Sequence, residues 1–359
     1  LPVNTNPLRF RASYHTLVGT MPVRIQWSRI SDEDLLSLRL CDLPVKIEGT
    51  PIEKRIRQLH KELDTHGIRL KPHVWISDEF FTPDGVPGFA VPFYLAHPRL
   101  RQLERKQMLE IEGGSEKDFM RIIRHEAGHA LDNAYLLHTD PSFRKIFGSL
   151  RRPYPESYRP NPNSRNYVLH LGSWYAQSHP LEDYAETFAV WLRPRWRSRY
   201  KGWPALRKLQ YIDRLIHNIS GKSSKNWYRE KVEPLREIKL TLREYYRRKK
   251  EQYAIEYPAY YDRDLLKIFS KEKRYASRQT AVSFLRYYRT EVRRLVAEGT
   301  GVHAYSIDHV YRTIMDRAKE LKLRTCYSKN RTRRQVLIML TVHTMHIVHS
   351  GRYRFYYGV

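Results

Sequence analysis

The chain has 359 residues, 41% of them hydrophobic, which allows a folded core and two domains and argues against a disordered protein. Its formal net charge of +27 is extreme and indicates a negatively charged partner or substrate. The two cysteines, Cys41 and Cys326, form no CxxC pattern, so we expect no disulfide framework and a reducing compartment, the cytoplasm. The longest apolar run, residues 336–348, is too short to span a membrane.

The first hundred or so residues are predicted to contain a helical segment followed by extended pieces. Residues 1–15 contain no apolar stretch of the kind found in signal peptides, so no secretory signal is expected there. Residues 31–67 begin with a helix-capping pattern, continue with helical apolar spacing and end at a glycine. Residues 70–81 alternate like a strand, a turn follows at TPDGVPG, and residues 89–98 indicate a second extended piece interrupted by proline.

Residues 116–137 are predicted to form one helix that carries the sequence RHEAGHALD. Its apolar positions recur at helical spacing and mark the buried side: Met120, Ile123, Ala127, Ala130, Leu131 and Ala134. Residues four apart share a helix face, so His125 and His129 can direct ring nitrogens at a single zinc ion. Glu126 is offset by one position, where its carboxylate can take a proton from an attacking water without ligating the metal. The alternative is a solvated helix with chance spacing, but the small residues around His129 favour close helix packing.

The HExxH pattern needs a third metal ligand from elsewhere in the chain. In metzincins this ligand is a histidine six residues after the second one, with a glycine midway. Asp132 and Tyr135 occupy those two places here, so that class is excluded. From Pro141 to about Leu171 the chain is rich in Pro, Arg, Asn and Tyr, which predicts a long surface excursion.

A second helix is predicted at residues 180–192, with a proline at its start. Glu182 and Glu186 are four residues apart and share a face of this helix. We assign Glu182 as the zinc ligand and Glu186 as the carboxylate that accepts a hydrogen bond from a ligating imidazole. A solvated acidic face is the alternative for this pair. His179 is the rival third ligand, although its place directly before the proline favours a position at the helix start.

HEAGHALD followed by YAQSHPLEDYAETFAVWL resembles a bacterial family of zinc-binding metallopeptidases whose second motif has the same form. The chain is also similar, more distantly, to the catalytic domain of anthrax lethal factor, which has an aromatic residue where this chain has Asp183. The resemblance covers roughly residues 30–205. It implies that Glu182 is the third ligand, that Glu186 supports it, and that Tyr175, seven residues before Glu182, stabilises the oxyanion. A neutral phenol is a suitable donor for that role, whereas a core position is the ordinary alternative for a tyrosine.

The resemblance implies an α+β fold with a zincin or gluzincin-like metallopeptidase domain, which we assign to residues 1–205. It also implies an edge strand beside the zinc helix on which an extended substrate would lie. Residues 206–359 are predicted to form a basic, Tyr/Arg-rich, mainly helical C-terminal region.

The charge is concentrated in this C-terminal region. Residues 206–359 contain 35 Lys and Arg against 15 Asp and Glu, whereas residues 1–205 contain 30 against 23. Seventeen of the 26 tyrosines also lie after residue 205, interleaved with Arg and Lys. Arginine beside aromatic residues suits acidic peptides and equally suits nucleic acids, and solvated amphipathic helices are the plain alternative. No named nucleic-acid-binding motif is present, so the inference that nucleic acid is a partner depends on charge alone.

Other histidines are weaker candidates for the site. His138 and His170 could stabilise an oxyanion in place of Tyr175. His343, His346 and His349 are three residues apart, which spreads them around a helix too widely for one metal and favours core or cleft positions.

The sequence therefore predicts a zinc metallopeptidase that hydrolyses a peptide or related amide bond, on an acidic peptide or protein substrate. Two alternatives remain at this level. One is a nucleic-acid-associated protein whose zinc domain processes bound proteins, and the other is a non-catalytic zinc-fold binding scaffold. The intact HExxH pattern argues against the scaffold.

Overall fold

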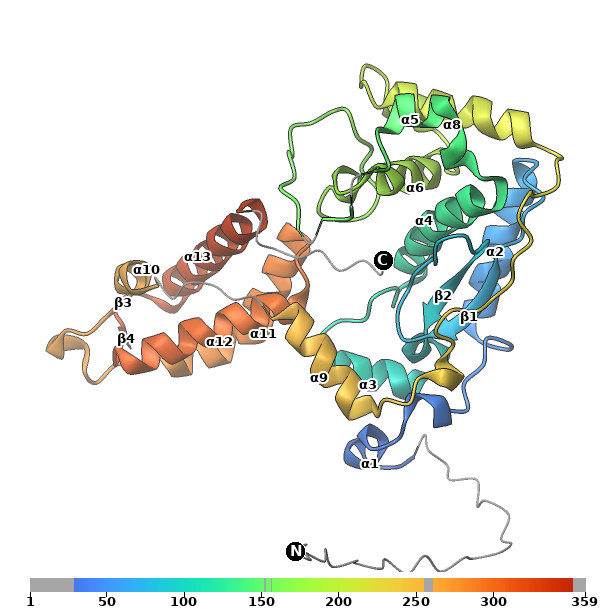
Figure 1. The fold of residues 1–359 in the computed structure, drawn as a ribbon. Helices are drawn as coiled ribbons and strands as arrows, with labels where there is room; N and C mark the ends of the chain where they lie inside the picture. The colour runs from blue at the N-terminus through green and yellow to red at the C-terminus, as the bar shows by residue number, and fades with distance from the viewer. Residues whose placement is uncertain (1–28, 152, 156, 255–260, 351–359) are drawn as a thin grey trace, which may run out of the picture.

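The computed structural model describes residues 29–151, 153–155, 157–254 and 261–350 (Figure 1). Helices dominate the described chain, and its β-structure consists of two two-stranded sheets. Most buried apolar side chains belong to one large cluster from Leu35 to Tyr253 or to a second from Tyr261 to Val348, and Trp75, Val86 and Ala90 form a small third one. In Figure 1 the second cluster is the orange and red group of helices that projects to the left. The structure is thus a mixed, mainly helical fold.

The first cluster begins with α1 (Asp32–Leu36) and α2 (Pro51–Thr65), which a 3₁₀ turn at Leu40–Asp42 separates. Ser31 caps α1, since its side chain accepts a hydrogen bond from the backbone N–H of Asp34, as the capping pattern predicted. The single helical segment predicted for residues 31–67 is therefore two helices. The backbone pairing of Leu40 and Cys41 with residues 238–240 breaks it, because those amides donate to distant carbonyl groups instead of continuing a helix.

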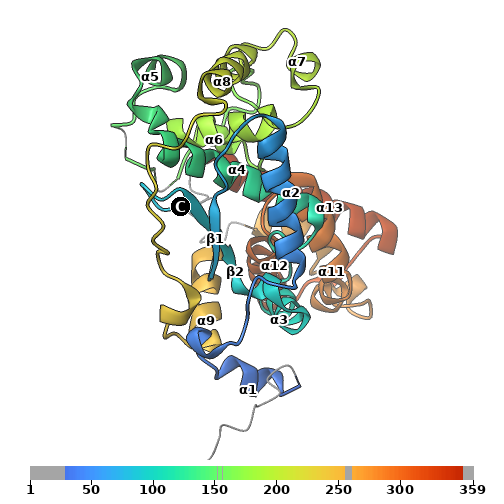
Figure 2. The same cartoon turned by 90° about the vertical axis from the view of Figure 1, so that its right-hand side faces the viewer.

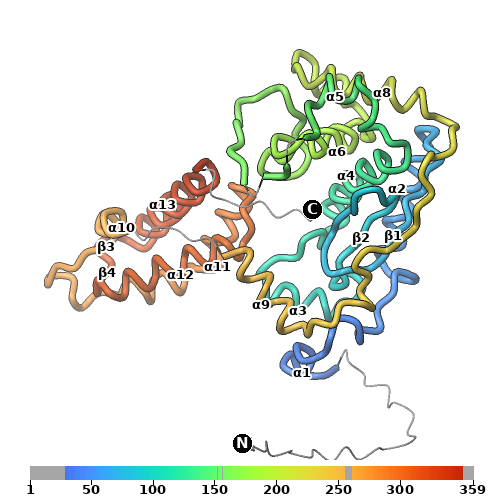
Figure 3. Tube along the Cα trace, viewed as in Figure 1, coloured from blue at the N-terminus to red at the C-terminus, as the bar shows by residue number. Residues whose placement is uncertain are grey.

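Strands β1 (His73–Ser77) and β2 (Gly88–Pro92) pair in parallel, with Trp75 opposite Ala90. On the far side of β2, Ala90 donates a backbone hydrogen bond of 2.8 Å to Phe81. The outer side of β1 is bounded by the segment that leads from α8 (Leu206–Ile219) to α9 (Leu242–Tyr253), where the Trp75 indole donates to the carbonyl of Val232. Figures 2 and 3 show this segment running past β1. The two extended pieces predicted from the sequence are confirmed, although Phe93–Ala96 forms a 3₁₀ turn.

Helices α4 (Glu116–Tyr135) and α6 (Pro180–Trp191) lie side by side at the centre of the first cluster (Figure 1). All six apolar positions predicted for the inner side of α4 are buried. Gly128 makes the close approach possible, because a Cβ atom there would lie only 3.0 Å from Cα of Ala185 and 3.2 Å from Cδ1 of Phe188. The small residues of the AGHA stretch thus let α6 approach the histidine-bearing helix.

Within the first cluster, α3 (Pro98–Met108) and α9 are linked by a buried ion pair. Lys249 Nζ lies 3.2 Å from Glu104 Oε1, and both side chains are almost fully buried. The predicted domain limit at residue 205 stays a prediction. The hydrophobic clusters themselves place α8 and α9 with the elements before residue 205 and divide between Tyr253 and Tyr261.

The second cluster contains α10 (Asp262–Ile268), α11 (Ala281–Thr300), α12 (Ala304–Glu320) and α13 (Lys329–His349), with β3 (Phe269–Ser270) and β4 (Arg324–Thr325) as a short antiparallel pair. The mainly helical character predicted for the basic region is confirmed. Several of its tyrosines are buried and serve packing: Tyr245, Tyr246, Tyr253, Tyr261 and Tyr311. The tyrosines of residues 351–359 and the predicted absence of a signal sequence at residues 1–15 fall outside the described residues.

Residues 141–171, predicted to be a surface excursion, are partly structured. Pro141–Phe147 forms α5, and its Phe143 and Phe147 are buried against Tyr184 of α6. The hydrophobic pattern of the sequence did not predict this helix, because the helix is short and lies among prolines and arginines. Cys41 and Cys326 are free, as expected. No helix of the described chain is long and apolar enough to cross a membrane.

Candidate metal and catalytic site

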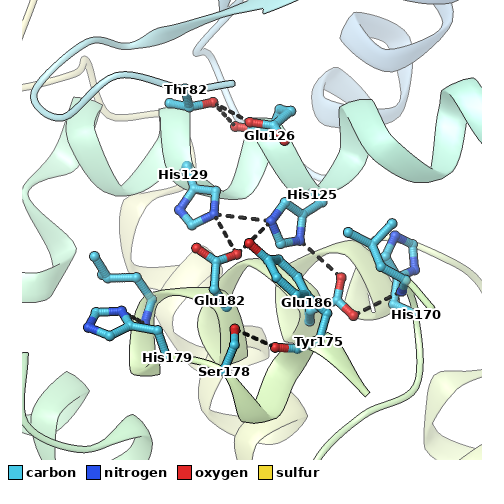
Figure 4. A network of polar contacts seen from close by, with 12 residues as sticks. Thr82, His125, Glu126, His129, His170, Tyr175, Ser178, His179, Glu182 and Glu186 are labelled. Carbon is cyan, nitrogen blue, oxygen red and sulfur yellow. Dashed lines mark hydrogen bonds and ion pairs between the residues drawn. The ribbon is translucent and has the colours of Figure 1, made fainter. Parts of the chain in front are cut away.

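Helix α4 presents the two histidines of the HExxH pattern on the face that meets α6 (Figure 4). Ser115 caps its N-terminus by accepting a hydrogen bond from the backbone of Asp118, and the helix continues for 20 residues without a break. Nε2 of His125 lies 3.1 Å from Nε2 of His129. The predicted helical spacing therefore directs both imidazoles to one point.

Glu182, in the first turn of α6, completes this group. Its Oε2 atom lies 3.0 Å from His125 Nε2 and 3.3 Å from His129 Nε2. One ligand atom from each of the three residues falls within 4.8 Å of the others, and no other such group of His, Cys, Asp and Glu occurs among the described residues. Two imidazole nitrogens and one carboxylate oxygen are a donor set suited to zinc, so the residues fit the metal.

The electrostatics of the group also favour a cation. Burial alone would lower the pKa of His125, but the hydrogen bonds and charges of Glu182 and Glu186 raise it to about 10. The buried carboxylates therefore stabilise positive charge at the imidazole pair, and a divalent cation there would be stabilised by the same groups.

Glu186 contacts the ring nitrogen of His125 that is remote from Glu182 and His129. Its Oε1 lies 3.0 Å from Nδ1 of His125, and its Oε2 accepts a hydrogen bond of 2.9 Å from the backbone N–H of Leu171. This contact fixes the ring of His125 and leaves Nε2 to face Glu182 and His129. Such a carboxylate contact to the remote nitrogen is typical of metal-ligating histidines.

Glu126 lies beside the histidine pair and outside the three-residue group. Its Oε2 accepts a hydrogen bond of 2.8 Å from the hydroxyl of Thr82, which follows the Phe81 bridge to β2. Burial raises the pKa of Glu126, while the neighbouring His125 and His129 act in the opposite direction. The irregular segment after Phe81 thus passes Glu126 at Thr82, and the edge strand expected beside the zinc helix stays a prediction.

Tyr175 points its phenol toward the histidine and glutamate group (Figure 4). Its ring lies 5.7 Å from the ring of His125, and its side chain is buried. Burial and the nearby Glu182 raise its pKa well above the ordinary value, so the phenol stays a neutral hydrogen-bond donor. Two consecutive residues with positive φ, Ser173 and Trp174, precede it, and this backbone is unusual for residues other than glycine.

The remaining histidine candidates lie outside the metal group. His179 caps α6 by accepting a hydrogen bond from Leu181, as its place before the proline predicted. His138 binds Asp132, with 2.9 Å between Nδ1 and Oδ1. His170 lies 2.8 Å from the carbonyl oxygen of Arg121, and burial lowers its pKa to about 4. His343 pairs with Asp264 on α10, so the histidines of α13 do not form a second metal group.

Two residues that sequence reasoning missed contact the site. Thr82 binds Glu126, and Tyr154 donates a hydrogen bond of 2.9 Å from its phenol to Oε1 of Glu182. Tyr154 also stacks on His179 with 4.0 Å between ring centroids. Both residues lie in irregular segments, whose side chains follow no period, and no sequence signal distinguishes Tyr154 from the other tyrosines.

The match to a known family coincides with this site. Residues 96–195 match the family described as "Putative zinc-binding metallo-peptidase". The matched segment contains α4, α6 and all three candidate ligands, and it ends before the basic region. Comparison with curated proteins and with solved structures gave no match. The family resemblance seen in the sequence is confirmed for this segment, zinc is the metal that the family and the donor set indicate, and the likeness to lethal factor stays a prediction.

The hydrogen bond from Tyr154 predicts an effect on metal affinity. It holds Oε1 of Glu182 and leaves Oε2 directed at the two histidines, so Tyr154→Phe should weaken zinc binding by about 10- to 100-fold. Competition with a chromophoric chelator measures this affinity without any substrate. Tyr158→Phe is the matched control, because it makes the same chemical change and the Tyr158 phenol donates to the carbonyl of Ser173 instead of to Glu182. Equal zinc affinity of both variants would contradict the prediction.

Proposed function

We propose that the protein is a zinc-dependent peptidase that hydrolyses a peptide or related amide bond. The convergence of His125, His129 and Glu182, within a segment that matches a zinc-binding peptidase family, carries this proposal. Glu126 adds a carboxylate at the position expected of a general base, directly after the first ligand.

Zinc at this group would lower the pKa of a bound water toward about 7 and polarise the substrate carbonyl. Glu126, oriented by Thr82, takes a proton from the attacking water, whose oxygen forms the new bond to the carbonyl carbon. The Tyr175 phenol donates a hydrogen bond to the oxygen that becomes negative. Glu126 then returns the proton to the amide nitrogen, the C–N bond breaks, and an acid and an amine leave.

An acidic peptide or protein is the substrate class that we propose, because the chain has a formal net charge of +27. The positive charge of the basic region would also attract nucleic acid, which is therefore the rival partner. Only nucleic acid should show the steep loss of affinity with salt that follows release of many counterions. Equal cleavage of basic and acidic peptides, together with tight and salt-sensitive nucleic-acid binding, would favour the rival.

Metal removal tests the proposed activity. The purified chain should contain one zinc ion, hydrolyse members of a mixed peptide library, lose that hydrolysis on treatment with a chelator, and regain it with added zinc. His125→Ala should remove zinc, which elemental analysis measures. Stoichiometric zinc in the His125→Ala protein would refute the ligand assignment, and hydrolysis that persists without metal would refute the proposed activity.

A further inference from the structure

A polar pocket of about 600 Å³ opens where α4 gives way to α5, near the candidate site. It lies between the turn after α4 and the segment after α5. Its lining is His138, Thr139, Arg144, Ser149, Leu150 and Arg151. His138 is the one lining residue that the sequence suggested for a role at the site, and none of the six belongs to the metal group.

Two connections place the pocket next to the catalytic groups. His138 is bound to Asp132, which is one helical turn beyond His129 on α4. Arg151 also lines the pocket and precedes Tyr154 by three residues, and the Tyr154 phenol donates a hydrogen bond to Glu182. Asp84, two residues after Thr82, acts electrostatically on both His138 and Tyr154, so the segment beside Glu126 lies near both residues. The pocket lining is thus connected to the residues around the metal group through Asp132 on α4 and through the segment that carries Tyr154.

The charges of the pocket suit an anion. Arg144 and Arg151 are exposed, and neither forms an ion pair within the described part of the chain. The hydrogen bond with Asp132, together with the charges of Asp132 and Asp84, raises the pKa of His138 against the effect of burial. The opposing charges are Asp132, which His138 already engages, and Asp84. Two guanidinium groups that form no ion pair with any described residue therefore remain to bind a ligand.

We propose that this pocket is a substrate subsite that binds a carboxylate, with Arg144 and Arg151 as the groups that contact it. A guanidinium group matches a carboxylate with two parallel hydrogen bonds, which a diffuse positive surface does not provide. The subsite rests on the proposed peptidase function and gives the preference for acidic substrates a specific location. That location lies before residue 205, outside the region with the greatest surplus of charge.

Binding to a catalytically blocked protein tests the subsite separately from hydrolysis. The probe is the zinc-loaded full chain with Glu126→Gln, titrated with fluorescent peptides in an anisotropy assay. One amidated peptide carries Glu, a second replaces it with Gln, a third with Lys, and a fourth is the Gln peptide with a free C-terminus. The first and fourth peptides distinguish a side-chain carboxylate from a terminal one.

We expect one of the two carboxylate peptides to bind about 10-fold or more tightly than the neutral peptide, in keeping with charge-assisted hydrogen bonds. Arg144→Gln with Arg151→Gln should remove that preference, and the double change to Glu should favour the Lys peptide. Lys145→Gln is the matched control, since Lys145 is an exposed cation of α5 outside the pocket lining. The preference of the Lys145→Gln variant for the carboxylate peptide should stay within about twofold of the parent's, because a single exposed charge acts weakly through solvent.

The outcomes separate the two proposals. A carboxylate preference that survives both arginine substitutions, or that Lys145→Gln reduces equally, would overturn the subsite and leave a general field as the cause. Arginine-dependent binding by a wild-type chain that hydrolyses none of the peptides would refute the peptidase and retain the subsite. Zinc content and thermal midpoint, equal to those of the parent, establish that the variants are folded.

Discussion

Glu126→Gln should retain one zinc ion per chain and lose hydrolysis by about 10²- to 10⁴-fold in kcat, the usual contribution of a general base. The carboxamide keeps the shape of the side chain and can still accept a hydrogen bond from Thr82. It cannot take a proton from water, so the step that creates the nucleophile fails. His125, His129 and Glu182 are unchanged, so the metal should stay bound.

Glu116→Gln is the control for Glu126→Gln, because it makes the same chemical change at an exposed position in the first turn of the same helix. Its kcat and zinc content should equal those of the wild type. Elemental analysis and steady-state kinetics on one peptide measure both variants. Normal turnover by the zinc-loaded Glu126→Gln protein would exclude Glu126 as the base.

The centre of the site was predictable because its spacing is local. The side chains of His125 and His129, and those of Glu182 and Glu186, lie one turn apart on their own helices, and helical geometry alone fixes which of them share a face. The meeting of the two helices depends on Gly128 and Ala185, whose small size allows contact. The pattern of small residues in HEAGHALD was the signal for that contact.

The contacts that surround this centre come from segments without periodicity. Thr82 is 44 residues from Glu126, and Tyr154 is 28 residues from Glu182, and no rule of spacing relates a turn residue to a distant helix. The same reasoning applies to α9, which a composition shift assigned to the basic region. The buried ion pair between Lys249 and Glu104 joins residues 145 apart in sequence. Tertiary packing brings them together, and composition alone does not predict that contact.

The chain as a whole has a positive net charge, whereas the interior around its candidate site is rich in carboxylates. Burial raises the pKa of Asp183 to about 7 against the effect of Lys208, whose Nζ lies 2.6 Å away, and Glu186 acts in the same direction as burial. The interior around α6 is therefore rich in carboxylates, which suits a cation and would repel an acidic ligand. A net charge of +27 can draw an acidic substrate to the surface, but binding near the zinc requires cationic groups at the rim of the site.

Tyr175→Phe should fold normally, bind zinc and lower kcat by about 10- to 1,000-fold, because the phenol would donate a hydrogen bond to the oxyanion of the transition state. KM should change little, since the charge that the phenol stabilises is absent from the bound substrate. A change confined to KM would assign Tyr175 to ground-state binding, and unchanged kinetics would make it a core residue. Tyr184→Phe is the control, because that phenol is also buried, lies on α6 and has no hydrogen-bond partner within the described residues. Equal losses of kcat in the two variants would show that removal of any buried hydroxyl here disturbs the site, and would withdraw the oxyanion role from Tyr175.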